Sequence, residues 1–280
     1  MIFNDSFINI DGHNARFRSF IPDVAEGSYA DKFKEARPAV VILPGGGYAY
    51  TSPREAEPIA LELCAKGICS FILDYAVADS GKVFPVALAE ALTAVKYVRD
   101  NAKEFCIDKD NISTLGFSAG GHLCACTGTL WNSPVLNGFL DGNRKAYRPD
   151  KMILCYPVIS AEPFAHKGSF ENLLGKKFDE ITDDERKLVS LEKQVGVHTP
   201  PTFIWSTTED NGVPIRNSTA MADALAANGI PMEIHIYPHG HHGLSTGNNV
   251  TCDVPFGSDY DCADWMQKAV KFIYDKFDKK

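Results

Sequence analysis

Short continuous runs of apolar residues recur along the chain, and Gly, Pro, Asp or Ser follows them. Runs of this length that are rich in β-branched residues fit strands buried on both faces of a mostly parallel sheet. The six runs lie at residues 39–43, 68–73, 112–117, 152–156, 202–205 and 233–237. Two earlier segments, 2–10 and 15–21, alternate apolar and polar residues, which predicts two half-exposed antiparallel strands.

The stretches between these runs have the spacing of amphipathic helices. Helices are predicted at residues 55–66, 85–105, 214–228 and about 259–278. The second of them places one apolar stripe on its surface, formed by Leu88, Leu92, Val95 and Val98. Strands that alternate with helices predict an α/β fold with a doubly wound, mostly parallel sheet and helices on both faces. Ligands of such sheets bind outside the carboxyl ends of the strands.

Residues 160–200 interrupt this alternation. They contain charged, helix-like pieces but no strand pattern, and a stretch of this length in a compact domain is rarely a plain loop. We therefore expect one domain over residues 1–280, with a cap-like insertion at about 160–200 over the carboxyl edge of the sheet.

The charge balance narrows the class of protein. The 280 residues include 28 Lys and Arg against 36 Asp and Glu, which gives a formal net charge of −8. A chain of this kind lacks the basic face that neutralises a nucleic-acid backbone. No apolar run approaches the roughly 18 to 20 residues that span a bilayer, and the first residues lack the pattern of a signal peptide. We expect a cytoplasmic protein that binds neither nucleic acid nor membrane, and the pattern leaves a homo-oligomer open.

Eight cysteines are present, most of them inside apolar runs, and no two have the CxxC spacing. We expect free buried thiols of a reducing compartment. Cys252 and Cys262, which lie in a loop-like region, are the one pair for which a disulfide stays open.

The sharpest chemical signal is Gly-Phe-Ser-Ala-Gly at residues 116–120, between the strand at 112–117 and a stretch that reads as a helix. In this context G-x-S-x-G is typical of a nucleophile elbow, a strained turn that lifts the serine Oγ above the sheet. Gly116 and Gly120 allow the backbone to close, and the helix after Ser118 directs its amide dipoles at the same point. The alternative interpretation is a glycine-rich turn without a function.

A serine hydroxyl is a weak nucleophile, so catalysis needs a base and a group that orients the base. Both residue types follow the last two predicted strands: Asp210 comes after the strand at 202–205, and His242 comes after the strand at 233–237. The order serine, acid, histidine is that of α/β-hydrolases and differs from the order in other serine-hydrolase folds.

Each of these assignments has a competitor. Glu209 could be the acid, but it lies nearer the strand end, where a side chain more often caps a turn. His235 alternates within a strand and is interpreted as structural. The cluster of His235, His239, His241 and His242 also raises a zinc site, but neither HExxH nor a carboxylate-bearing ligand set accompanies it, so we expect no metal.

Three glycines at residues 45–47 follow the first buried run, in the sequence LPGGGY. A phosphate cradle is excluded, because neither Gly-Lys-Ser/Thr nor G-x-G-x-x-G is present. The remaining alternatives are a flexible loop and an oxyanion hole, in which glycine lets backbone amides approach a substrate oxygen. The donors of such a hole would be the amides of Gly46, Gly47 and Ala119.

Five segments together resemble the α/β-hydrolase esterases related to acetyl-xylan and other carbohydrate acetyl esterases: LPGGGYAYTSPREAEPIA, FPVALAEALTAVKYVRDNA, GFSAGGHL, PPTFIWSTTEDNGVP and HGHHGL. The resemblance runs from about residue 38 to the C-terminus. It implies that Ser118, Asp210 and His242 form a catalytic triad and that the three amides named above form the oxyanion hole. Related lipases have HGGG, and Pro44 replaces that histidine here, so the loop must be anchored in another way.

The resemblance implies a serine carboxylesterase for short-chain acyl esters, with acetyl esters of carbohydrates as the lead, and it implies no cofactor. A peptidase of the same fold and a non-catalytic hydrolase-like binding protein are the alternatives. Tyr48 and Trp131, with Tyr50, Phe164 and Phe170, are candidates for substrate contact, although packing in the core or the cap explains these aromatic residues equally well.

Overall fold

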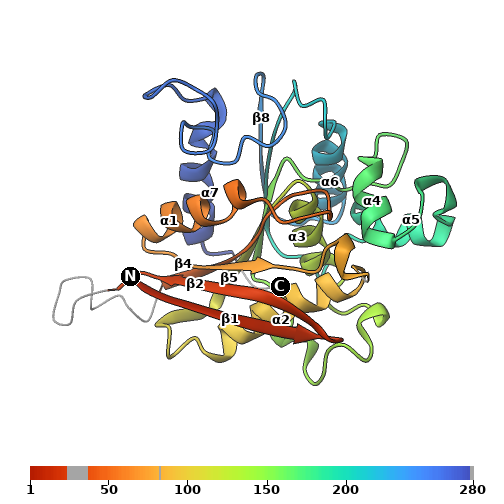
Figure 1. The fold of residues 1–280 in the computed structure, drawn as a ribbon, viewed down its shortest axis with the longest axis horizontal. Helices are drawn as coiled ribbons and strands as arrows, with labels where there is room; N and C mark the ends of the chain where they lie inside the picture. The colour runs from red at the N-terminus through yellow and green to blue at the C-terminus, as the bar shows by residue number, and fades with distance from the viewer. Residues whose placement is uncertain (24–36, 82, 278–280) are drawn as a thin grey trace.

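The computed structural model describes residues 1–23, 37–81 and 83–277, and one eight-stranded sheet forms its centre (Figure 1). The strand order is β1-β2-β4-β3-β5-β6-β7-β8. The strands are β1 (Ile2–Ile10), β2 (His13–Ile21), β3 (Arg37–Leu43), β4 (Cys69–Asp74), β5 (Ile107–Phe117), β6 (Lys151–Cys155), β7 (Thr202–Thr207) and β8 (Met232–Tyr237). Antiparallel pairing joins β1 to β2 and β2 to β4, whereas all other pairs are parallel. The predicted mostly parallel sheet is therefore confirmed.

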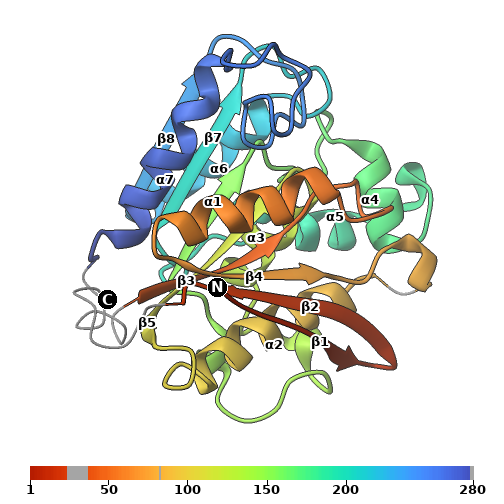
Figure 2. The same ribbon diagram turned by 60° about the vertical axis from the view of Figure 1, so that its left-hand side comes forward.

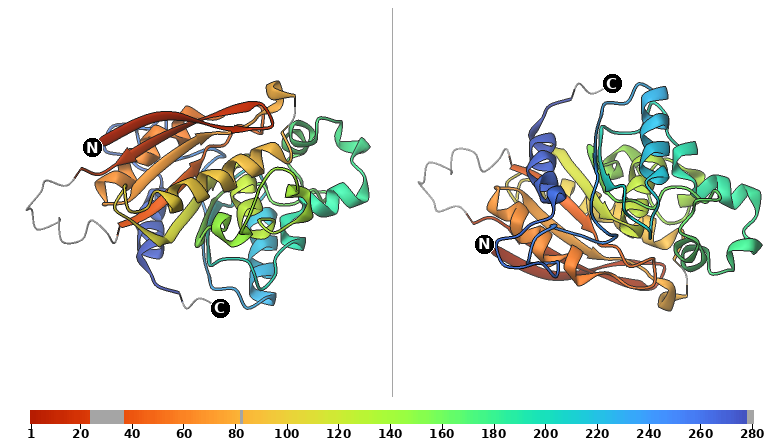
Figure 3. Two further views of the ribbon diagram at one scale, coloured as in Figure 1. Left: turned by 90° about the horizontal axis from the view of Figure 1, so that it is seen from below. Right: turned by 90° about the horizontal axis from the view of Figure 1, so that it is seen from above.

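The first two strands form the predicted antiparallel hairpin, which lies at one outer edge of the molecule in both views of Figure 3. The turn consists of Asp11 and Gly12, whose φ angles of 49° and 83° are left-handed, as the tight hairpin turns require. The start of β5 differs from the prediction: the strand begins at Ile107, five residues before the apolar run. Its first part carries polar side chains, so the apolar pattern did not indicate it.

Helices cover both faces of the sheet (Figure 2). Helices α1 (Glu57–Ala65) and α7 (Trp265–Tyr274) share one apolar cluster with the sheet, and α2 (Val86–Asp100), α3 (Ala119–Thr129) and α6 (Arg216–Ala227) share the other. Alternate residues of β3 enter the two clusters, Val41 on the α2 side and Val40 on the α1 side. This is why the strand reads as a continuous apolar run: both of its faces are buried.

The predicted helices are confirmed with shorter bounds. The segment at 85–105 is helical over α2 alone, and the last helix ends at Tyr274. Several connections contain single turns of 3-10 helix: η2 (Pro53–Glu55), η3 (Ala78–Ser80), η4 (Pro134–Leu136), η5 (Arg144–Tyr147) and η8 (Asp261–Asp264).

The connection from β6 to β7 contains helices and no strand. It holds α4 (Lys167–Leu174), η6 (Phe178–Glu180), α5 (Asp183–Val189) and η7 (Leu191–Lys193). Figures 1 and 2 show α4 and α5 side by side at one side of the molecule, beyond α3. Helix α4 also reaches the glycine loop after β3, because the side-chain amide of Asn172 donates to the carbonyl oxygen of Gly47 at 2.8 Å.

All eight cysteines lie within the described residues and are free thiols, so Cys252 and Cys262 form no disulfide in this structure. The thiol of Cys252 instead donates to the carbonyl oxygen of Leu244. Among the described residues, no helix has the length and apolar character needed to cross a bilayer.

Candidate active site

Ser118 occupies the sharp turn between β5 and α3, with φ 52° and ψ −116°. A Cβ at Gly116 would lie 2.0 Å from the carbonyl oxygen of Gly120, and a Cβ at Gly120 would lie 2.1 Å from that of Leu43. Only glycine fits at these two positions, because no side chain tolerates backbone atoms at such distances. The turn therefore has the geometry that the G-x-S-x-G motif predicts.

The three candidate catalytic side chains form one hydrogen-bonded chain. Nε2 of His242 lies 2.8 Å from Oγ of Ser118, and Nδ1 of the same ring lies 2.7 Å from Oδ2 of Asp210. A carboxylate only accepts, so Nδ1–H donates to Asp210 and Nε2 is left to accept from the serine hydroxyl. The other oxygen of Asp210 accepts the amides of Gly212 and Val213, which fixes the carboxylate. This geometry suits proton transfer from the hydroxyl to the imidazole.

The competing acid lies outside this chain of hydrogen bonds. Glu209 is exposed, accepts the amide of Gly240 at 3.0 Å and lies 3.0 Å from Nδ1 of His239. Its hydrogen bond with His239 holds the pKa of the Glu209 carboxyl below its usual range. The role that the sequence indicated for Glu209, capping a turn, matches these contacts.

The remaining histidines of the cluster have separate partners. His235 on β8 lies 2.6 Å from Glu233, and Nδ1 of His241 lies 2.7 Å from the carbonyl oxygen of His242. Within the described ranges, no group of three or more His, Cys, Asp or Glu side chains is arranged to hold a metal ion.

The glycine loop lies directly against the serine. A Cβ at Gly45 would lie 3.1 Å from Cβ of Ser118, and Gly46 has a φ angle of 130°, which favours glycine. In the described part of the chain, the amides of Gly46, Gly47 and Ala119 donate no hydrogen bond. Three unengaged N–H groups on the two segments that flank Ser118 are the arrangement that an oxyanion hole needs.

Two side chains that the sequence did not single out anchor this loop. The carboxyl of Glu55 is buried and accepts the amide of Gly45 at 2.8 Å, and the hydroxyl of Tyr75 donates to the carbonyl oxygen of Pro44 at 2.5 Å. The loop is thus anchored although Pro44 replaces the histidine of related lipases. Glu55 lies in a segment that reads as the start of a helix, and no local pattern marks it as a partner of Gly45.

Helix α4 brings a further polar pair to the loop. Oγ of the buried Ser169 lies 3.8 Å from where a Cβ at Gly47 would be, and 2.8 Å from Nδ1 of His166. Burial lowers the pKa of His166, and repulsion from a protonated His242 would lower it further. Side chains at the start of α4 therefore lie beside the glycine loop.

The side chains of the two proposed substrate contacts are buried in this structure. Trp131 follows the far end of α3, about 16 Å along the helix from Ser118, and its buried ring packs edge-on against His198. Tyr48 lies beside the glycine loop, but its side chain is 1% exposed and its hydroxyl lies 2.8 Å from Nδ1 of His122. Proximity in sequence to the motifs was the signal for both residues, and it does not show the direction of a side chain.

Two of the other three aromatic candidates pack against neighbouring side chains. The ring of Phe170 is buried and packs edge-on against His122, with 5.4 Å between ring centroids. The guanidinium of Arg216 lies 4.4 Å from the centroid of the Phe164 ring. Of the five aromatic residues, Tyr50 is the exposed one.

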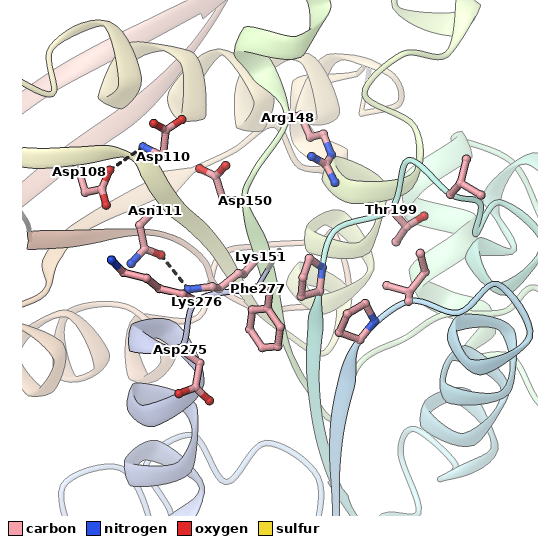
Figure 4. A pocket seen from close by; sticks show the side chains of 14 residues that line it. Asp108, Asp110, Asn111, Arg148, Asp150, Lys151, Thr199, Asp275, Lys276 and Phe277 are labelled. Atoms are coloured by element: carbon pink, nitrogen blue, oxygen red, sulfur yellow. Dashed lines mark hydrogen bonds between the residues drawn. The ribbon is translucent and has the colours of Figure 1, made fainter. Parts of the chain in front are cut away.

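A separate cavity of about 320 Å³ opens at the amino ends of β5 to β8 (Figure 4), whereas Ser118 follows the carboxyl end of β5. The starts of β5 and β6 and the stretches before β7 and β8 line it. The ammonium group of Lys151 donates there to Oδ1 of Asn111 and to the carbonyl oxygen of Ile273, and burial lowers its pKa to about 8. Among the described residues that line this cavity there is no histidine, serine or cysteine.

Comparison with known proteins gives the family. Residues 28–225 match the BD-FAE family. Endo-1,4-beta-xylanase B of Butyrivibrio fibrisolvens is 35% identical over 82% of this chain, and acetylxylan esterase of Xylanibacter ruminicola is 32% identical over 85% of it. The chain covers 36% of the first relative and 45% of the second, so it spans less than half the length of each.

A solved structure covers almost the whole chain. The acetyl ester-xyloside bifunctional hydrolase of Caldicellulosiruptor lactoaceticus superimposes with a TM-score of 0.76 at 34% identity, over 94% of this chain and 88% of that one. With the sheet described above, this likeness confirms the predicted α/β-hydrolase fold and the resemblance to esterases.

Proposed function

The chain belongs to the BD-FAE family and has the α/β-hydrolase fold, and from this premise we propose that it is a serine carboxylesterase. The observation that carries the proposal is the hydrogen-bonded chain from Oγ of Ser118 through His242 to Asp210. The relative named acetylxylan esterase and the solved structure of an acetyl ester-xyloside bifunctional hydrolase support the same class of reaction.

In the proposed reaction, Nε2 of His242 takes the hydroxyl proton as Oγ of Ser118 attacks the ester carbonyl carbon. Asp210 accepts from Nδ1–H and stabilises the imidazolium that forms. The carbonyl oxygen, now an oxyanion, accepts hydrogen bonds from the backbone amides of Gly46, Gly47 and Ala119. The ester C–O bond then breaks, the alcohol leaves with the proton from His242, and water repeats both steps on the acyl-enzyme.

Substitution of the nucleophile tests this assignment. We expect Ser118→Ala to lower kcat for p-nitrophenyl acetate by roughly 10⁴- to 10⁶-fold, because the remaining groups cannot form an acyl-enzyme. Ser6→Ala, on the exposed hairpin, is the matched control and is expected to hydrolyse the ester like the wild type. Circular dichroism establishes that both variants are folded. Undiminished turnover by folded Ser118→Ala would refute the proposal.

We propose acetyl esters of carbohydrates as the substrate class, with the segment at 160–200 as a cap beside the site. The proposal rests on the relative named acetylxylan esterase, on the solved structure of an acetyl ester-xyloside bifunctional hydrolase, and on the burial of Ser118, which is 7% exposed. We expect kcat/KM to fall by about tenfold or more from p-nitrophenyl acetate to the octanoate, because extra methylenes must enter a closed site. Equal or better hydrolysis of the octanoate would contradict a small acyl site.

A further inference from the structure

Glu55 is a buried carboxyl beside the glycine loop, and the reaction described above does not use it. It is 3% exposed, and each of its oxygens accepts one hydrogen bond: Oε2 from the amide of Gly45 at 2.8 Å and Oε1 from the hydroxyl of Tyr156 at 2.6 Å. Burial raises the pKa of Glu55, whereas these two donors lower it. A buried carboxylate is costly unless it is paired in this way.

The first of these hydrogen bonds leads to the amides beside the serine. A Cβ at Gly45 would lie 2.6 Å from Oε2 of Glu55 and 3.1 Å from Cβ of Ser118, so Gly45 packs closely against both the carboxyl and the nucleophile. The amides of Gly46 and Gly47 follow directly. By holding the Gly45 amide, Glu55 therefore fixes the position of the backbone that directly precedes these two donors.

The second hydrogen bond leads to the histidine. The Tyr156 hydroxyl that donates to Glu55 also accepts the amide of Ser245 at 2.9 Å, three residues after His242. The Tyr156 ring packs edge-on against the His242 ring, with 5.2 Å between centroids. One carboxyl thus joins the glycine loop, the end of β6 and the loop that carries the histidine.

We propose that Glu55 is a positioning residue: its buried carboxylate holds the glycine loop and, through Tyr156, the His242 ring in register with Ser118. The inference rests on the proposed esterase function. Glu55 touches none of the reacting atoms, and it acts by keeping donors and base where charge develops in the transition state. Displacements of about 1 Å at such a site can cost about 100-fold in rate.

Glu55→Gln tests this role, because the side-chain amide keeps the shape but replaces one acceptor oxygen with a donor. We expect kcat for p-nitrophenyl acetate, per active site titrated with a fluorophosphonate, to fall about 10- to 100-fold while KM changes by less than about threefold. The inhibition constant of a trifluoromethyl ketone, which forms a tetrahedral adduct with the serine, is expected to rise by a similar factor. A carboxyl that only stabilises the fold would change neither readout.

Glu90→Gln is the matched control. Glu90 is fully buried on α2, its Oε2 accepts the amide of Ala76 at 2.7 Å, and its Oε1 pairs with His13. These contacts resemble those of Glu55 but involve neither the glycine loop nor the histidine loop. We expect Glu90→Gln to unfold more easily and to keep the kcat of the wild type per active site.

A second variant covers the case in which Glu55→Gln does not fold. Tyr156→Phe keeps the ring against His242 and removes the hydroxyl, so we expect a smaller loss of kcat and of ketone affinity with KM unchanged. The inference would be overturned if folded Glu55→Gln kept the kcat and the ketone affinity of the wild type, and Tyr156→Phe is judged in the same way if Glu55→Gln does not fold. Equal losses of kcat in Glu55→Gln and Glu90→Gln would overturn it as well. Neither result would refute the proposed esterase function. Absence of ester turnover in the wild type would refute the proposed function and this inference with it.

Discussion

At the scale of single residues, the site depends on backbone conformations that most side chains avoid. Ser118, Tyr156 and Ser245 have φ angles of 52°, 35° and 55°. Such conformations cost of the order of 1–3 kcal/mol each and persist only where the surroundings fix them. Here the glycines around Ser118 leave room for the turn, and the amide of Ser245 donates to the Tyr156 hydroxyl. The strained residues lie beside the candidate catalytic groups.

His122 gives a pH-dependent prediction at the same scale. It is fully buried, with Nε2 at 2.8 Å from the carbonyl oxygen of Val189 and Nδ1 facing the hydroxyl of Tyr48. Burial lowers the pKa of His122 from 6.5 to about 4. The unfolded chain then binds more protons between these pH values, so stability falls as the pH drops from about 6.5 to 4. The loss attributable to this group is about 2 kcal/mol at pH 5 relative to pH 7.

Urea unfolding of the wild type and of His122→Gln at pH 7 and pH 5 measures this loss. Glutamine can donate to Val189 and accept from Tyr48, but it does not titrate. We expect the difference in unfolding free energy between the two pH values to be about 2 kcal/mol smaller in the variant. The same difference in both proteins would show that His122 does not carry the effect.

At the scale of elements, the hydrogen bond from Asn172 joins α4 to the glycine loop. Removal of the Asn172 side-chain amide frees the carbonyl oxygen of Gly47, and the peptide beside a proposed oxyanion donor can then rotate. Because one hydrogen bond of this kind contributes about 1 kcal/mol, we expect Asn172→Ala to lower kcat by up to about tenfold.

Steady-state kinetics with p-nitrophenyl acetate measures this change, and Asn228→Ala is its control. The amide of Asn228 also donates to a carbonyl oxygen, that of Ala224 at 2.9 Å, but at the exposed end of α6. Equal kcat values for the two variants would show that the hydrogen bond between α4 and the glycine loop does not affect the reaction.

The elements themselves were largely predictable, because burial leaves a periodic trace in the sequence. The stripe of Leu88, Leu92, Val95 and Val98 is fully buried in α2. Prediction was less accurate where the apolar pattern and the secondary structure do not end together. Strand β5 extends over polar residues, and Phe277 packs beside the core after α7 has ended. Element ends depend on local hydrogen bonds that the apolar pattern does not record.

At the scale of the whole molecule, the parallel sheet brings distant residues to one edge. Ser118 follows β5, Asp210 follows β7 and His242 follows β8, and the carboxyl ends of these strands face the same way. The meeting of these three residues was predictable, because motif context and chain order point to strand ends. Glu55, Tyr156 and Asn172 were not, because their contacts with the site arise only from tertiary packing.

The proposed mechanism requires Ser118 to be an activated nucleophile. Reaction of the folded protein with a fluorophosphonate, followed by peptide mass spectrometry, tests it most directly. The proposed triad predicts one covalent adduct, on Ser118, that forms within minutes and is lost in His242→Ala. An unmodified Ser118, or an adduct on another residue that forms equally fast without His242, would show that Ser118 is not the activated nucleophile.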